Sequence, residues 1–115
     1  MDLDIIIGEE LTAVEFVQDY LQLRFGDPLL ALFAWPHIAD ADLVSVAHGE
    51  PGYRDALCSV IGEDVSATTF NEGSELTIEF ENGTVIALSL REEDLATPEA
   101  GHFRPSPDSH EQYEF

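Results

Sequence analysis

The chain has 115 residues, which favours a single domain, and 44% of them are hydrophobic, enough to form a buried core. It carries 24 Asp and Glu against four Arg and no Lys, giving a formal net charge of −20. This charge argues against binding to a nucleic-acid backbone or to an anionic membrane, and it favours a cationic partner. An acidic surface that only maintains solubility, or that reflects a salt-rich host, would explain the same composition.

The cysteine count and the lengths of the apolar runs indicate where in the cell the protein is located. A single cysteine, Cys58, excludes an internal disulfide and a cysteine-only metal site, and it fits a reducing environment. The first ten residues lack the basic segment and the apolar run of a signal peptide. The longest apolar run, residues 29–35, is far shorter than the roughly 20 residues of a membrane helix. We therefore expect a cytoplasmic protein without a membrane segment.

A ten-residue stretch occurs twice, as IGEELTAVEF at residues 7–16 and as IGEDVSATTF at residues 61–70. Five of the ten aligned positions are identical, and the match resumes after a turn that is one residue longer in the second copy. The apolar positions aligned there are Leu21 with Leu76, Leu23 with Ile78 and Phe25 with Phe80. This similarity predicts an internal duplication of about residues 3–35 and 57–90.

The first half reads as a run of short strands. Residues 2–7 are either a helical turn or the start of a strand. Alternating or continuous apolar residues then predict strands at 11–17, 20–25 and 29–34, with turns at 17–19 and 26–28. Short turns between successive strands indicate an antiparallel meander.

The connecting region is predicted less completely. Residues 36–49 contain an apolar run at 43–46 that is a candidate strand. Pro51 favours the first turn of a helix, and Gly62 favours its C-terminal end. The helical spacing gives one buried stripe, with Cys58 half-buried beside it. The stripe consists of Tyr53, Leu57, Val60 and Ile61.

The second half repeats the meander and then changes in composition. Strands are predicted at 65–71, 74–80 and 84–90, and Asn82-Gly83 is a strong hairpin turn because both residues tolerate positive φ. From Ala96 onward the chain is rich in proline, and we expect a tail that lies over the domain or is partly disordered. Residues 112–115 could form an edge strand, with Phe103 and Phe115 as anchors.

These elements predict an α+β fold. Two duplicated three-stranded antiparallel meanders would share one core, with the central helix packed on the sheet. The most economical packing is one mostly antiparallel sheet with an approximate two-fold axis between the meanders. We assign residues 1–95 to a single domain and residues 96–115 to the Pro-rich tail.

The sequence offers no catalytic constellation. Cys58 has no identifiable activating base, and no serine lies in a Gly-x-Ser-x-Gly elbow. Five residues of metal-ligand type fall within fourteen positions, but their spacing matches no metal-binding motif. These residues are His37, Asp40, Asp42, His48 and Glu50. We therefore expect a protein that is not an enzyme and that has no catalytic residue, cofactor or metal ion.

Carboxylates held on a sheet are a candidate docking surface for Arg and Lys side chains of a partner. Strand periodicity places two of them on one side of the second meander, and the others lie in adjacent turns or in the connecting region. The candidate partner-binding residues are Glu72, Glu75, Glu79, Glu81, Asp40, Asp42 and Glu50. An ordinary solvated face of a very acidic protein is the alternative.

The segments VEFVQDYLQLRF and YRDALCSVIG, followed by a second meander that ends in LSLREED, resemble small single-domain bacterial proteins of unassigned function. This resemblance covers about residues 5–98. In size, charge and architecture the chain also loosely resembles the small acidic immunity proteins that accompany secreted antibacterial toxins. Neither resemblance implies catalytic residues.

The leading hypothesis is an acidic module that binds a basic protein, such as an immunity protein neutralising a basic toxin. Acidic mimicry of nucleic acid is less favoured, because the row of carboxylates is short. Two alternatives come from other classes. One is an enzyme or a domain that binds a metal or small ligand at residues 35–50. The other is a self-assembling structural domain, and either a monomer or a homodimer fits the sequence.

Overall fold

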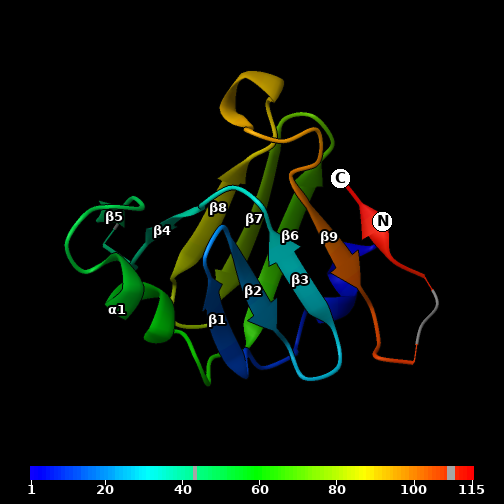
Figure 1. The fold of residues 1–115 in the computed structure, drawn as a ribbon. Helices are drawn as coiled ribbons and strands as arrows, with labels where there is room; N and C mark the ends of the chain where they lie inside the picture. Colours follow the sequence, from blue (N-terminus) through cyan, green and yellow to red (C-terminus); the bar gives the residue numbers. More distant parts are fainter. Residues whose placement is uncertain (43, 109–110) are drawn as a thin grey trace.

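The computed structural model describes residues 1–42, 44–108 and 111–115. Within these residues the chain forms two five-stranded antiparallel sheets, one six-residue helix and two short 3-10 helices (Figure 1). The mostly antiparallel strands and the helix agree with the predicted class at a coarse level. The prediction of one shared sheet is wrong, because the strands divide into two sheets.

The first sheet is built from the first meander and from the C-terminal strands. Its strand order is β1-β2-β3-β9-β10, and every neighbouring pair is antiparallel. The strands are β1 (Ala13–Val17), β2 (Tyr20–Arg24), β3 (Leu29–Leu32), β9 (Gly101–Arg104) and β10 (Tyr113–Glu114).

The second sheet is built from the second meander and from the connecting region. Its order is β5-β4-β8-β7-β6, again antiparallel throughout. The hairpin turn between β7 and β8 contains Gly83 at a φ of +89°, as the Asn-Gly pair predicts. The strands are β4 (His37–Ala39), β5 (Ser45–Val46), β6 (Val65–Asn71), β7 (Glu75–Phe80) and β8 (Val85–Ser89). Leu43, within the predicted run at 43–46, lies outside the described residues.

One apolar core lies between the two sheets (Figure 1). Alternation along β2 buries Leu21 and Leu23, and alternation along β7 buries Leu76 and Ile78. Each meander therefore buries one apolar face, and the two faces cover each other. This is the physical reason for two facing sheets rather than one extended sheet.

Helix α1 (Tyr53–Cys58) contacts β1 of the first sheet and β4 of the second. It lies at one side of the two sheets (Figure 1), not across a sheet face as predicted. It is also shorter than the sequence predicted, because the amides of Val60 and Ile61 bond three residues back and the chain turns. Ile61 is therefore 43% exposed, and Cys58 is exposed, where both were expected to be at least half-buried.

The two copies of the repeated stretch lie side by side and exchange backbone hydrogen bonds. Gly8 donates to the carbonyl of Val65 over 2.8 Å, and Gly62 donates to the carbonyl of Leu11 over 2.8 Å. Gly62 aligns with Gly8 in the repeat, and Leu11 aligns with Val65. The residues before Gly8 form the 3-10 helix η1 (Leu3–Ile6), so the helical alternative for residues 2–7 is the observed one. The duplication itself remains a prediction.

The Pro-rich segment enters the first sheet. Strand β9 pairs with β3, and Phe103 is fully buried in the core. Phe115 packs against the core, and β10 corresponds to the predicted edge strand. No helix among the described residues has the length and apolarity needed to cross a membrane.

Candidate protein-binding surfaces

Two predicted acidic residues project from the outer face of the second sheet. Glu75 and Glu79 are exposed, and they alternate with buried residues along β7. Across the sheet Glu75 pairs with Ser89 of β8, and Glu79 pairs with Val85. On the other side of β7, Glu79 pairs with Ala67 of β6, and Glu75 pairs with Asn71, whose side-chain amide donates to the Glu75 carboxylate over 3.5 Å.

Glu72 and Glu81 flank β7 at opposite ends. Glu72 precedes the strand in the β6–β7 turn, and Glu81 follows the strand in the β7–β8 turn. Both are exposed, and the backbone amide of Glu81 donates to the carbonyl of Asp64 over 2.9 Å. The four predicted acids of this hairpin therefore follow the whole length of β7.

The turn that contains Asp40 and Asp42 lies against the β7–β8 hairpin turn. A Cβ built on Gly83 would come within 2.9 Å of the Cβ of Ala41. The Asp40 carboxylate accepts the amides of Asp42 and Val44 over 2.9 and 3.0 Å, so it stabilises its own turn. These two acids thus extend the acidic surface beyond the Glu81 end of β7.

Glu50 has a local structural contact. Its carboxylate accepts the amide of Ala47 over 2.7 Å, in the turn that precedes α1. The contact explains why an acid is placed there without any partner. Glu50 lies in the connection between β5 and α1.

A shallow depression of about 350 Å³ lies on the outer face of the second sheet beside Glu75. The hydroxyl of Ser89 donates to the carboxylate of Asp94 over 2.6 Å at its edge. Its lining residues are His37, Ser74, Glu75, Ala87, Leu88, Ser89, Arg91 and Asp94. His37 therefore faces this acidic surface and not the turn that contains Asp40.

A larger cleft of about 760 Å³ opens where the ends of both sheets meet the segment at 95–100. Its walls include the half-buried rings of Phe70 and Phe115, which meet edge to face at 5.7 Å. Glu72 and Glu92 belong to the same lining. The remaining lining residues are Gly73, Leu90, Leu95, Ala96, Thr97, Pro98 and Ala100.

Sequence reasoning missed this cleft. Glu92 belongs to the 3-10 helix η2 (Glu92–Asp94), a run that reads in the sequence as a charged strand end. The cleft joins residues that lie near 70, 90, 95–100 and 115. No local motif links these segments. The one sequence feature that could have indicated the cleft is the apolar pair Leu90 and Leu95 beside a charged turn.

A carboxyl pair adds negative charge near the cleft. The side-chain hydrogen bond that the Glu99 carboxyl forms with Glu114 raises the pKa of Glu99, and burial and the Glu114 charge act in the same direction. Glu99 directly precedes Ala100, and Glu114 directly precedes Phe115, both of which line the cleft. The pair indicates that acidic groups lie close together in this part of the surface.

The segment at 35–50 contains an aromatic stack. The rings of Trp35 and His48 lie 4.3 Å apart and nearly parallel, and the Phe16 ring also stacks with Trp35, at 6.5 Å between centroids. The guanidinium of Arg54 lies 5.7 Å from the centre of the Phe16 ring. His48 is thus engaged by a ring and not by the nearby carboxylates.

The expected alternative of a metal or ligand site at 35–50 receives little geometric support. No group of three or more His, Cys, Asp and Glu side chains in the described part of the chain could hold a metal ion. The cavity beside this segment measures about 90 Å³. It is lined by Ile38, Asp40, Val44, Val46, Ala56, Ser59 and Thr84.

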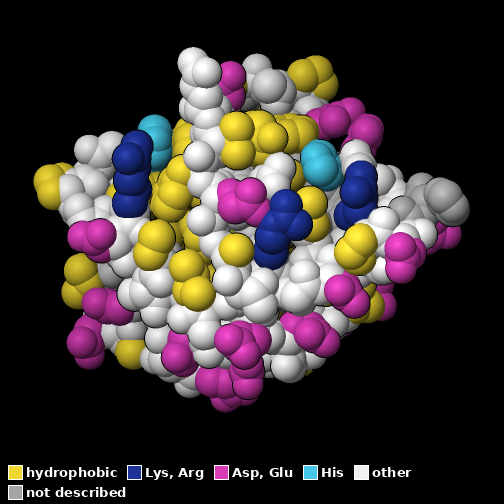
Figure 2. Space-filling view, turned by 60° about the horizontal axis from the view of Figure 1, so that its bottom comes forward, with side chains coloured by type: hydrophobic (Ala, Val, Ile, Leu, Met, Phe, Trp, Pro, Cys, Tyr) yellow, Lys and Arg dark blue, Asp and Glu magenta, His cyan; other side chains and the backbone are white. Residues whose placement is uncertain are grey.

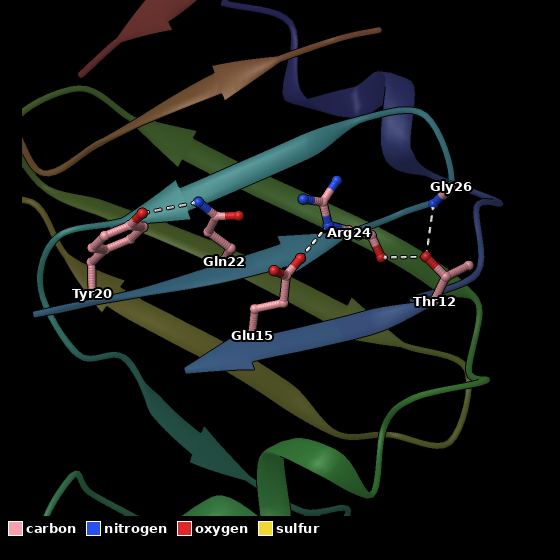
Figure 3. A network of polar contacts seen from close by, with 6 residues as sticks. All are labelled: Thr12, Glu15, Tyr20, Gln22, Arg24 and Gly26. Atoms are coloured by element: carbon pink, nitrogen blue, oxygen red, sulfur yellow. Dashed lines mark hydrogen bonds and ion pairs between the residues drawn. The ribbon is translucent and has the colours of Figure 1, made fainter. Parts of the chain in front are cut away.

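The outer face of the first sheet carries different kinds of side chain from the outer face of the second sheet. Arg24 forms an ion pair with Glu15, and the hydroxyl of Thr12 links the ends of the strands (Figure 3). The amide of Gln22 donates to the Tyr20 hydroxyl over 3.3 Å on the same face. Figure 2 shows a face on which Arg and His side chains lie among hydrophobic ones, with most acidic side chains at its margin.

No family model matches the chain, and comparisons with curated proteins and with solved structures give no significant match. The resemblance to small acidic immunity proteins therefore remains a prediction from size, charge and architecture.

Proposed function

We propose that this chain is a non-enzymatic protein-binding module that docks a basic protein on the outer face of its second sheet. The observation that carries the proposal is the pair Glu75 and Glu79, both exposed on one face of β7. Sheet carboxylates in fixed positions can accept charge-assisted hydrogen bonds from Arg and Lys. The most concrete partner is a basic toxin, with the chain as its immunity protein in the cytoplasm.

The charge of the whole molecule supports the same conclusion. With a net charge of −20, the chain would attract a basic protein over long distances and accelerate its encounter. The acidic turn with Asp40 and Asp42 would enlarge the docking area at the Glu81 end of β7. Binding of this kind weakens as salt screens the charges.

The test has two steps. The immobilised chain is used to capture proteins from host lysate at low salt, and proteins released at a defined step of a salt gradient are identified by mass spectrometry. The captured protein is then purified and titrated calorimetrically. We expect one-to-one binding whose affinity falls with salt.

The titration is repeated with two matched double variants. Glu75→Gln/Glu79→Gln removes two charges from the proposed surface and should weaken binding about tenfold or more. Asp19→Asn/Asp27→Asn removes two charges from exposed turns of the first sheet and should weaken it far less. Equal losses in both variants would show that only net charge matters and would contradict a docking surface on β7.

A further inference from the structure

The cleft near Phe70 and Phe115 combines an apolar floor with acidic groups at its wall. Leu90 and Ala100 are almost fully buried at its base, and Leu95 is half-buried beside them. A volume of about 760 Å³ falls within the range of clefts that hold drug-sized ligands. The cleft is therefore large enough for more than one side chain.

Glu72 and Glu92 form no ion pair with any residue that the structure describes. Among the described residues one ion pair occurs, between Arg24 and Glu15, and no Arg lines the cleft. Glu72 and Glu92 thus offer acceptors beside apolar walls. A cation that enters such a site can pair with the carboxylates while an adjacent apolar group packs on the walls.

We propose that this cleft binds an Arg or Lys side chain of the basic partner together with an apolar residue next to it in the partner sequence. The cation would lie between Glu72 and Glu92, and the apolar side chain would pack against Phe70, Leu95 and Phe115. This inference rests on the proposed function, because it assigns an anchor to the partner that docks on the second sheet. It adds a site that β7 does not contain.

The chemistry of the cleft explains the choice of occupant. An apolar ligand alone would leave the Glu72 and Glu92 carboxylates partly desolvated and without a partner, which is unfavourable. An anionic ligand would be repelled by Glu72 and Glu92 and by the Glu99 and Glu114 pair. A cation with an adjacent apolar group satisfies both parts of the lining.

The test uses a blocked Leu-Arg-Phe tripeptide as the probe, titrated into the ¹⁵N-labelled protein at low salt. We expect backbone amide shifts at Gly73, Ala96 and Thr97. The same peptide with citrulline in place of arginine keeps the shape and removes the charge, and it should bind about tenfold or more weakly. Citrulline binding of equal strength would overturn the inference, because the cleft would then be only apolar.

Variants connect the probe to the carboxylates. Glu72→Gln/Glu92→Gln should weaken the arginine peptide to the level of the citrulline peptide, while Asp19→Asn/Asp27→Asn should not. The circular dichroism spectrum and the melting temperature of each variant would show that the fold is intact. A peptide that binds Glu72→Gln/Glu92→Gln as tightly as the unchanged protein would also overturn the inference.

The failure of this inference can be separated from failure of the proposed function. Glu75→Gln/Glu79→Gln should reduce binding of the whole basic partner and leave the peptide affinity nearly unchanged. If the peptide does not bind but the partner still requires Glu75 and Glu79, the cleft assignment is wrong and the docking surface stands. If the peptide binds at the cleft but the partner binds Glu75→Gln/Glu79→Gln as tightly as the unchanged protein, the docking surface on β7 is wrong.

Discussion

Gly101 in β9 lies against the carbonyl oxygen of Ala31 in β3, with no room for a side chain between the strands. A Cβ built on Gly101 would come within 2.1 Å of that oxygen and within 3.1 Å of the Phe115 ring. Glycine is therefore required where the C-terminal segment enters the first sheet. The same contact places Phe103 in the core and Phe115 beside the cleft.

The substitution Gly101→Ala is expected to destabilise the protein by about 2–4 kcal/mol, because β9 must move away from β3. Urea denaturation followed by circular dichroism measures this free energy of unfolding. Gly73→Ala is the control, since Gly73 has a φ of +75° but no atom within 4 Å of an added Cβ. The control should cost about 1–2 kcal/mol, from backbone strain at positive φ alone. Equal costs would contradict the close contact between β9 and β3.

The buried hydroxyl of Tyr53 leads us to expect a loss of stability at high pH. Its hydroxyl donates to the carbonyl of Pro36 over 2.5 Å, and burial raises the pKa of Tyr53 from 10.0 to about 12. A raised pKa in the folded state means that the stabilisation is complete below pH 10 and is lost as the pH rises towards 12. The free energy of unfolding should therefore fall across this interval by on the order of 2 kcal/mol.

The variant Tyr53→Phe tests this directly. It should cost about 1 kcal/mol at neutral pH, because the carbonyl of Pro36 loses its donor. Between pH 10 and 12 it should lose less stability than the unchanged protein. When tyrosinate absorbance is titrated against pH, the curve of this variant should lack the component with the highest pKa. Parallel stability curves for the two proteins would show that Tyr53 does not titrate as described.

Local patterns predicted much of this fold. Alternating apolar residues located both meanders, and the Asn82-Gly83 pair located the hairpin turn between β7 and β8. Phe103 and Phe115 were expected to anchor the C-terminal segment, and both contact the core. These features depend on neighbours in the sequence, which is why periodicity and turn chemistry reveal them.

Pairings between distant segments were not predictable in the same way. Strand β9 joins β3 across about 70 residues of sequence, and only the absence of a side chain at Gly101 hints at close packing. The cleft combines four separate segments, so the role of Glu92 in its lining could not be read from the charged run in which it lies. Helix α1 was expected to be longer, because the apolar stripe in the sequence continues to Ile61. In the structure the chain turns before it reaches that residue.

The charge of the chain predicts that salt stabilises the fold. A net charge of −20 repels itself in the folded state, and ions screen that repulsion. Raising sodium chloride from about 0.05 to 0.5 M should raise the melting temperature by roughly 5 °C or more. Potassium chloride should act alike, since screening depends on ionic strength. A melting temperature that does not change with salt would show that the acids are too well spaced to repel.

The paired positions Gly8 and Gly62 allow a test of the predicted duplication. Their φ angles are +85° and +96°, and no atom lies within 4 Å of a Cβ added at either position. Each also donates to a carbonyl of the other copy over 2.8 Å. Gly8→Ala and Gly62→Ala should therefore each cost about 1–2 kcal/mol, from backbone strain alone, with values that agree within about 0.5 kcal/mol.

Urea denaturation of the two single variants and of the double variant measures these costs. The bonds of Gly8 and Gly62 lie on either side of the bridge between Glu10 and Asp64, so loosening one should loosen the other. The double variant is then expected to lose less than the sum of the two single costs. One glycine that tolerates alanine freely, while the other does not, would contradict matching environments for the two copies.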